Sequence, residues 1–195
     1  AGFAVTLYEK EDSLGGVVKH VIPGFRISDE AIAHDVALVT AYGAKLQLNT
    51  KIENLDSLKD AYDYVVLAAG ASEPGVLKLE KGEPVNALEF LADFKKHDGN
   101  LDLGKNVVVI GGGNTAMDTA RAAKRTKGVE HVYLVYRRTK RYMPADEEEL
   151  VMAVEDGVEF KELLAPKAQE NGMLLCDVMN LGEMDASGRR GVVAT

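Results

Sequence analysis

The sequence has almost no cysteine. Cys176 is the single cysteine among 195 residues, so this chain alone cannot form an internal disulfide, a C-x-x-C redox pair, a cysteine-rich zinc site or an iron–sulfur cluster. A lone thiol suits a reducing compartment, and no stretch resembles a transmembrane span or a signal peptide. We therefore expect a cytoplasmic protein in which Cys176 is a buried small hydrophobic residue.

A surplus of positive charge is also missing. Lys and Arg number 23 against 31 Asp and Glu, which gives a formal net charge of −8. That balance argues against nucleic acid or an anionic membrane as a partner. Metal-ligand spacing is missing as well, because His20 and His34 have no suitably spaced partners and are interpreted as surface or loop histidines. The acidic run 146–149 is typical of the capped, solvated start of a helix, so no metal site is predicted.

The feature that is present is a short apolar run followed by three consecutive glycines. Residues 107–110 (VVVI) have the β-branched character of a buried parallel strand. Gly111, Gly113 and Ala116 then occupy the three small positions of a G-x-G-x-x-A dinucleotide-binding fingerprint. The first permits a tight turn, the second lets the backbone approach a pyrophosphate, and the third lets the helix pack on the strand.

The surroundings of this loop match the usual context of the fingerprint. An alanine-rich helix is predicted from Thr115 to about Thr126, and a second strand from His131 to Tyr136. The unpaired N–H groups and the positive dipole end of that helix would face the phosphates. The alternative is a tight turn that binds nothing, but a strand, loop, helix and second strand in this order favour a dinucleotide site.

The residues after the second predicted strand indicate which dinucleotide binds. An NAD site usually has Asp or Glu there, to accept hydrogen bonds from the ribose 2′-hydroxyl. This chain has Arg137 and Arg138, with Lys140 and Arg141 close behind. Guanidinium groups bind a 2′-phosphate, which a carboxylate would repel. The cluster favours NADPH over NADH, the alternative being that its members are solvated loop charges.

An incomplete version of the same pattern begins the sequence. Residues 4–8 are predicted to form a buried strand that ends at Glu9, where a Rossmann unit presents its ribose-binding acid. Gly15 and Gly16 are small enough for a ligand to approach the backbone closely. No first strand or glycine fingerprint stands upstream, so we expect a fragment of a longer protein. The alternative is an ordinary strand-end carboxylate followed by an ordinary turn.

The remaining elements are predicted from periodicity and capping. Ser28 should begin a helix that places Ile32, Val36 and Val39 on one face, against a sheet, and ends at Gly43. The other expected elements are a strand over 44–48, a short helix over 55–61, a continuous apolar strand over 64–68, a helix over 86–94 with a capping box of Asn86 and Glu89, a helix over 146–155, a strand over 158–164 and hairpins over 173–195 with a turn at 185–188.

Together these elements predict an α/β protein. We expect two Rossmann-like, three-layer dinucleotide-binding halves, the first truncated at its N-terminus. Residues 1–80 would form the partial FAD-binding-type domain, 81–103 a connecting segment with one helix, and 104–195 the NADPH-binding Rossmann domain with its C-terminal hairpins.

Five stretches carry a resemblance to a known family. LYEKEDSLGG, VIPGFR, VVLAAGA, VVVIGGGNTAMDTAR and VYRRTKRYMPADEEE occur in this order and cover nearly the whole chain. They resemble the flavin- and NADPH-binding module of the glutamate synthase small subunit, a module of the pyridine nucleotide-disulphide oxidoreductase type. The same module recurs in dihydropyrimidine dehydrogenase, in ferredoxin–NADP oxidoreductases of this type and in a selenate reductase-type subunit.

The resemblance implies two groups of cofactor-binding residues. For FAD they are Glu9 at the adenosine ribose, Gly15 and Gly16 at the flavin, and Gly70 with Ala71 at the turn where the two halves meet. For NADPH they are Gly111, Gly113, Asn114, Thr115 and Ala116 at the pyrophosphate, and Arg137 and Arg138 at the 2′-phosphate.

The resemblance also implies a function. The parent protein would pass electrons from NADPH through FAD to iron–sulfur clusters or to a partner subunit, and the cofactors would carry the chemistry. No catalytic side chain is predicted, and the fragment alone is expected to be inactive. The alternative is a non-catalytic nucleotide-binding or interaction module that retains the fold. An unpaired sheet edge in the first half would favour a homodimer of the fragment.

Overall fold

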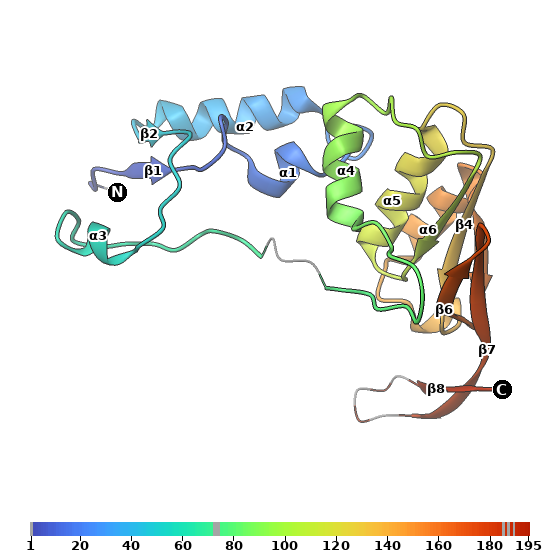
Figure 1. The fold of residues 1–195 in the computed structure, drawn as a ribbon. Coiled ribbons are helices and arrows are strands. Elements are labelled where there is room, and N and C mark those ends of the chain that lie inside the picture. The colour runs from blue at the N-terminus through green and yellow to red at the C-terminus, as the bar shows by residue number, and fades with distance from the viewer. Residues whose placement is uncertain (1, 72–74, 185, 187, 189) are drawn as a thin grey trace. The chain divides into compact units, whose positions relative to one another are not determined.

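The computed structural model describes residues 2–71, 75–184, 186, 188 and 190–195. The chain divides into two compact units, Ala1–Pro74 and Gly75–Thr195. Each unit is described by itself, and Figure 1 labels their elements. Both contain helices and parallel strands, which confirms a mixed α/β fold.

The second unit is built on a parallel sheet of three strands in the order β3-β4-β5. β3 (Asn106–Ile110) pairs with β4 (His131–Tyr136), and β4 pairs with β5 (Glu159–Glu162). The first two confirm the predicted strands. The predicted strand over 158–164 is shorter, because Leu163 has a φ of +58°, a left-handed conformation that interrupts the extended chain.

Three helices accompany this sheet. α5 (Asn114–Arg125) follows the glycine loop and packs against β3 and β4, whereas α4 (Ala87–Lys96) and α6 (Glu147–Glu155) pack against α5. Asn86 is the N-cap of α4, as predicted, and accepts the N–H of Leu88 at 2.8 Å. All three helices confirm predicted ones.

The core of the second unit lies between α5 and the sheet. Met117 and Leu134 are completely buried there, and burial of each such side chain contributes about 1.5–3 kcal/mol. The alanines of α5 let the helix axis lie close to the strands. The buried residues of this core are Val109, Ala116, Met117, Ala120, Ala123, Val132, Leu134, Ala153 and Val158.

An ion-pair group joins the end of α6 to α5. Arg121 Nε donates to Asp156 Oδ2 at 2.7 Å, and Arg125 Nη2 donates to Asp156 Oδ1 at 2.9 Å. Partial burial alone would raise the pKa of Asp156, but the hydrogen bonds and charges of Arg125 and Arg121 outweigh it and lower that pKa below its ordinary value.

An antiparallel sheet completes the second unit; its β7–β8 pairing falls within the hairpins predicted over 173–195, whereas its first strand, β6, was not predicted. β6 (Leu164–Glu170), β7 (Met173–Met184) and β8 (Arg190–Ala194) stand in the order β6-β7-β8. In Figure 1 β8 lies along the far end of the long strand β7, where Met184 pairs with Arg190. Of the predicted turn 185–188, Asp185 and Ser187 lie outside the described residues.

The first unit has a smaller sheet. β1 (Thr6–Tyr8) and β2 (Lys45–Gln47) pair in parallel, and the helices are α1 (Gly16–His20), α2 (Asp29–Ala41) and α3 (Asp56–Lys59). Ser28 caps α2 by accepting the N–H of Ala31 at 3.2 Å. β1, β2, α2 and α3 confirm predicted elements, although β1 is only partly buried where a buried strand was predicted. α1 was not predicted, and His20 ends this helix instead of lying in a loop.

One predicted strand of the first unit does not form. Residues 64–68 have no strand conformation, and the side chain of Val66 is 86% exposed. A strand needs a neighbour for its backbone hydrogen bonds, and among the described residues β1 pairs with β2 alone. The apolar face of α2 is likewise partly uncovered, because Ile32 is buried but Val39 is 44% exposed.

Within the part of the chain that the structure describes, no helix is long and apolar enough to cross a membrane.

Candidate nucleotide-binding site

The loop between β3 and α5 has the geometry that the fingerprint requires. Gly111 has a φ of +144°, in a region that side chains rarely adopt. A Cβ atom on Gly111 would lie 3.1 Å from the Cβ of Ala116. The turn therefore needs glycine at the first position and tolerates little beyond alanine at the third.

The middle glycine, which the fingerprint leaves unspecified, is the most constrained. A Cβ atom on Gly112 would lie 2.5 Å from a ring carbon of Tyr136, the last residue of β4. The Tyr136 hydroxyl in turn donates to the carbonyl of Tyr142 at 2.8 Å. The contact between Gly112 and Tyr136 was not predicted from the sequence. Two features could have indicated it, the third consecutive glycine and the aromatic residue at the end of the second predicted strand.

Gly113 is different because the fold itself does not require it. It is the N-cap of α5 with ordinary extended dihedral angles, φ −98° and ψ 172°. A Cβ atom there would meet Pro144 Cγ at 3.9 Å, an ordinary contact. The space in front of Gly113 is thus open at the end of α5 where unpaired N–H groups and the positive dipole favour an anion.

The start of α6 is bonded to this loop. Ala145 N–H donates to the carbonyl of Gly112 at 3.0 Å. Asp146 N–H donates to Asn114 Oδ1 at 3.2 Å, and Asn114 Nδ2 donates to Asp146 Oδ2 at 3.4 Å. Asp146 is the N-cap of α6, as predicted, but its carboxylate bonds to Asn114 and makes no capping hydrogen bond to its own helix. The amide of Asn114 is therefore engaged with a neighbouring helix.

The basic cluster follows β4 at the carboxyl end of the parallel sheet. Arg137 is exposed, whereas Arg138 is half-buried and its Nε donates to the carbonyl of Arg190 in β8 at 2.8 Å. The backbone that runs from Arg138 to Lys140 is held by hydrogen bonds to the last residue of β5 and to the residue after it. Leu163 N–H donates to the Arg138 carbonyl at 3.2 Å, and Lys140 N–H donates to a carboxylate oxygen of Glu162 at 2.8 Å.

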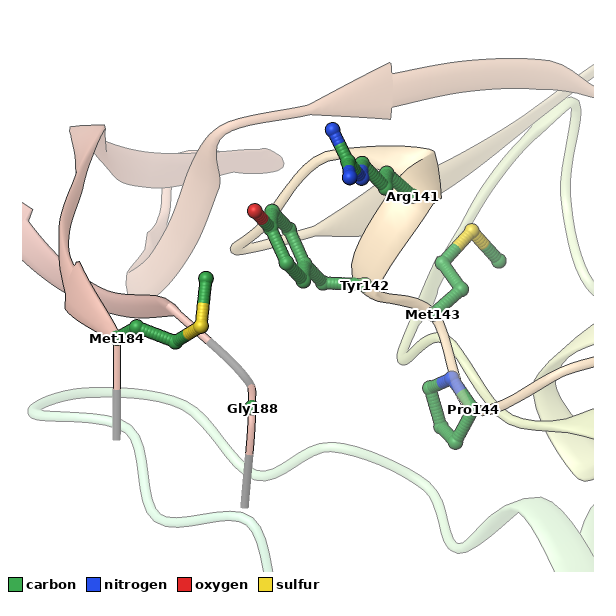
Figure 2. Close-up of a pocket in the computed structure, with 6 residues that line it drawn as sticks. All are labelled: Arg141, Tyr142, Met143, Pro144, Met184 and Gly188. Atoms are coloured by element: carbon green, nitrogen blue, oxygen red, sulfur yellow. The ribbon is translucent and has the colours of Figure 1, made fainter. Parts of the chain in front are cut away.

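A cavity of about 490 Å³ lies beside this cluster. Figure 2 shows the Tyr142 ring between Met184 on one side and Met143 with Pro144 on the other, with Arg141 above the ring. The Arg141 guanidinium carbon is 6.0 Å from the centre of that ring, at the outer limit for a cation–π contact. Pro144 also faces Gly113, so the cavity adjoins the open space before α5.

The candidate residues of the first unit lie just after β1, at the start of α1 and directly after the stretch 64–68. Glu9 directly follows β1, and its Oε1 accepts the N–H of Glu11 at 3.0 Å. Gly16 and Gly70 have positive φ values of 50° and 71°, and a Cβ atom on either would meet nothing within 4 Å. Gly15 has φ +123°, and its Cβ would lie 2.7 Å from that of Lys19, so α1 itself requires this glycine.

The described part of the chain shows neither a metal-binding cluster nor a thiol with a lowered pKa. It contains no group of three or more His, Cys, Asp and Glu side chains placed to hold a metal ion. Cys176 is half-buried, and burial followed by the charge of Asp177 raises the pKa of its thiol. A raised pKa keeps the thiol protonated and unreactive.

Solved structures share this fold. FprA from Mycobacterium tuberculosis in complex with NADPH superposes with a TM-score of 0.78 at 18% identity, over 98% of this chain and 60% of that one. The likeness places the chain in a class of mixed α/β folds that includes dinucleotide-binding oxidoreductases. More specifically, the chain belongs to the pyridine nucleotide-disulphide oxidoreductase family, whose model matches residues 9–168.

Two curated relatives are similar over almost all of the chain. A protein of Escherichia coli (strain K12) named as an oxidoreductase, YgfK, is 45% identical over 100% of this chain and 19% of its own length. The glutamate synthase [NADPH] small chain of the same strain is 35% identical over 97% of this chain and 44% of its own length. The chain therefore spans less than half the length of either relative.

Proposed function

We propose that this chain is the nucleotide-binding part of an NADPH-dependent flavin oxidoreductase. The proposal is carried by Gly113, a glycine that the fold does not need, at the open N-terminus of α5. Its neighbours Gly111 and Ala116 are fixed by packing, so the loop is preorganised around that space. Family membership and the names of the relatives support the same conclusion.

The residues present fit NADPH. The pyrophosphate would lie at the loop and first turn formed by Gly111, Gly113, Asn114, Thr115 and Ala116, where a helix end favours negative charge. The N–H groups of Gly111 and Ala116 donate to the carbonyls of Val135 and Gly113, so these two residues would shape the loop. Arg137 and Arg138 would bind the 2′-phosphate, since both follow β4, the strand adjacent to β3. The adjoining cavity lined by Tyr142 and Met184 offers apolar surface for the adenosine.

The first unit fits part of an FAD-binding, Rossmann-like half. Glu9 follows a parallel strand, where a carboxylate can accept hydrogen bonds from a ribose. Gly16 and Gly70 leave open space where a side chain would stand, and Gly15 and Ala71 are their immediate neighbours in the sequence. When bound, the two cofactors would supply hydride transfer and single-electron release to an iron–sulfur partner, while the chain binds and orients them.

The test is a calorimetric titration of the chain with NADPH and with NADH. A bidentate, charge-assisted contact to the 2′-phosphate contributes about 1.5–3 kcal/mol, so NADPH is expected to bind roughly ten- to a hundredfold more tightly. Equal affinities, or a preference for NADH, would overturn the assignment of the nucleotide. An absorbance spectrum of the longer parent protein, with and without NADPH, tests the flavin.

A further inference from the structure

Arg138 is held by a strand that lies outside the parallel sheet. Its Nε donates to the backbone carbonyl of Arg190, the first residue of β8, at 2.8 Å across 52 positions of sequence. A guanidinium group has five N–H donors, one on Nε and four on the two terminal nitrogens. The bond to Arg190 uses the Nε donor, so the paired terminal nitrogens retain the fork geometry that matches a phosphate.

The position of that carbonyl depends on how β8 is attached to β7. Arg190 Nη1 donates to the carbonyl of Gly182 in β7 at 3.2 Å. Arg190 also pairs with Met184, which lines the cavity together with Arg141 and Tyr142 (Figure 2). The Arg190 side chain thus anchors the beginning of β8 to β7, and the Arg190 carbonyl at this position accepts the hydrogen bond from Arg138.

We propose that the β7–β8 hairpin is a coenzyme-selectivity element in which Arg190 positions Arg138 for the 2′-phosphate of NADPH. This inference rests on the proposed function. Arg190 is a positioning residue that acts through Arg138, so its contribution concerns the 2′-phosphate alone. Loss of the anchor should weaken NADPH binding and leave NADH binding unchanged, whereas a merely structural role would weaken both.

The experiment compares dissociation constants for NADPH and NADH by titration of the 195-residue chain. In Arg190→Ala we expect the NADPH constant to rise about three- to tenfold, the size of one lost orienting hydrogen bond, with no change for NADH. The matched control is Thr195→Val, because the Thr195 hydroxyl makes the same kind of bond from the other end of β8, to the Val178 carbonyl at 2.8 Å. That variant should keep both constants.

Two further variants separate positioning from charge. Arg190→Gln removes the charge but keeps an N–H donor for Gly182, and it should retain most of the preference for NADPH. Arg138→Ala should reduce the preference to the part that Arg137 supplies, and adding Arg190→Ala to it should cause no further loss. An unchanged ratio of the two constants in Arg190→Ala, an equal loss for both nucleotides, or a loss in Arg190→Gln as large as in Arg190→Ala would overturn the inference. Absence of any NADPH preference in the unaltered chain would instead overturn the proposed function.

Discussion

The two units contain apolar stretches of the same kind that end in different structures. In the second unit, VVVI at 107–110 becomes a strand with Val109 buried. In the first unit, YVVLA at 64–68 also contains three residues that favour strands, one Tyr and two Val, yet it is not a strand and Leu67 is 69% exposed. Residues 107–110 pair with β4 and are covered by α5. The comparison shows that propensity selects a candidate strand and that neighbours decide whether it forms.

The helices of the two units also differ, in how much of their surface is buried. α2 and α5 both form where the sequence predicts them, since capping and composition act within one helix. Residues 116–123 of α5 are all buried, whereas Ile32 is the buried residue of α2 and Leu38 is 52% exposed. The second unit is thus organised around one complete core, and the first unit is not.

The largest expected difference between the units lies in their response to side-chain truncation. Leu134→Ala removes a completely buried side chain and should cost about 2–5 kcal/mol of unfolding free energy. Val66→Ala removes a side chain that is 86% exposed and should change stability by no more than about 0.5 kcal/mol. Amide hydrogen exchange, read separately for each unit, measures both. A large loss at Val66 would show that residues 64–68 are covered in solution.

Gly113→Val should separate binding from folding in the second unit. The backbone there is extended and a Cβ atom has room, so the variant should fold, with a melting temperature lowered only by the poorer N-cap preference of valine. NADPH binding should be lost, because the side chain would occupy the approach of the pyrophosphate to the backbone.

Gly112→Ala provides the opposite case, because its Cβ atom would press into the Tyr136 ring. We expect that variant to lose about 1–3 kcal/mol of stability. Normal NADPH binding by folded Gly113→Val would place the phosphate loop elsewhere.

The Asp156 ion-pair group makes the stability of the second unit depend on pH. Because the pKa of Asp156 is lower in the folded chain than in the unfolded chain, its contribution is present above the unfolded pKa and is lost as the pH falls through the folded one. Asp156→Asn should therefore cost about 1–3 kcal/mol near neutral pH and progressively less in acid. Urea unfolding at several pH values measures this, with the exposed neighbour Glu155→Gln as control. Equal losses at all pH values would contradict it.

Local features were predictable from the sequence, whereas contacts between distant residues were not. The strand, loop and helix around Gly111 follow from residue size and dihedral preference within a dozen positions, and the sequence alone indicated them. Arg138 bonds to Arg190 and Asn114 to Asp146, and no local pattern predicts such pairs. The end of β5 at Glu162 was missed because Leu163 adopts a positive φ that its side chain does not favour.

The smallest expected effect distinguishes two helix caps, one in each unit. Ser28 bonds to its own helix, so Ser28→Ala should destabilise α2 by about 0.5–2 kcal/mol. The carboxylate of Asp146 bonds instead to Asn114, beside the open end of α5. Asp146→Asn keeps an oxygen that can accept from Asn114 and removes a negative charge close to the proposed pyrophosphate site.

We therefore expect Asp146→Asn to bind NADPH about two- to fivefold more tightly at low salt, the scale of one charge at a helix end. Glu147→Gln removes the same charge one residue further on, from an exposed side chain, and should have a smaller effect. Titrations at increasing salt should bring the variants together, since screening shortens the reach of exposed charges. Weaker NADPH binding by Asp146→Asn would contradict this expectation. It would mean that the carboxylate contributes more by holding Asn114 in place than it costs by repelling the phosphates.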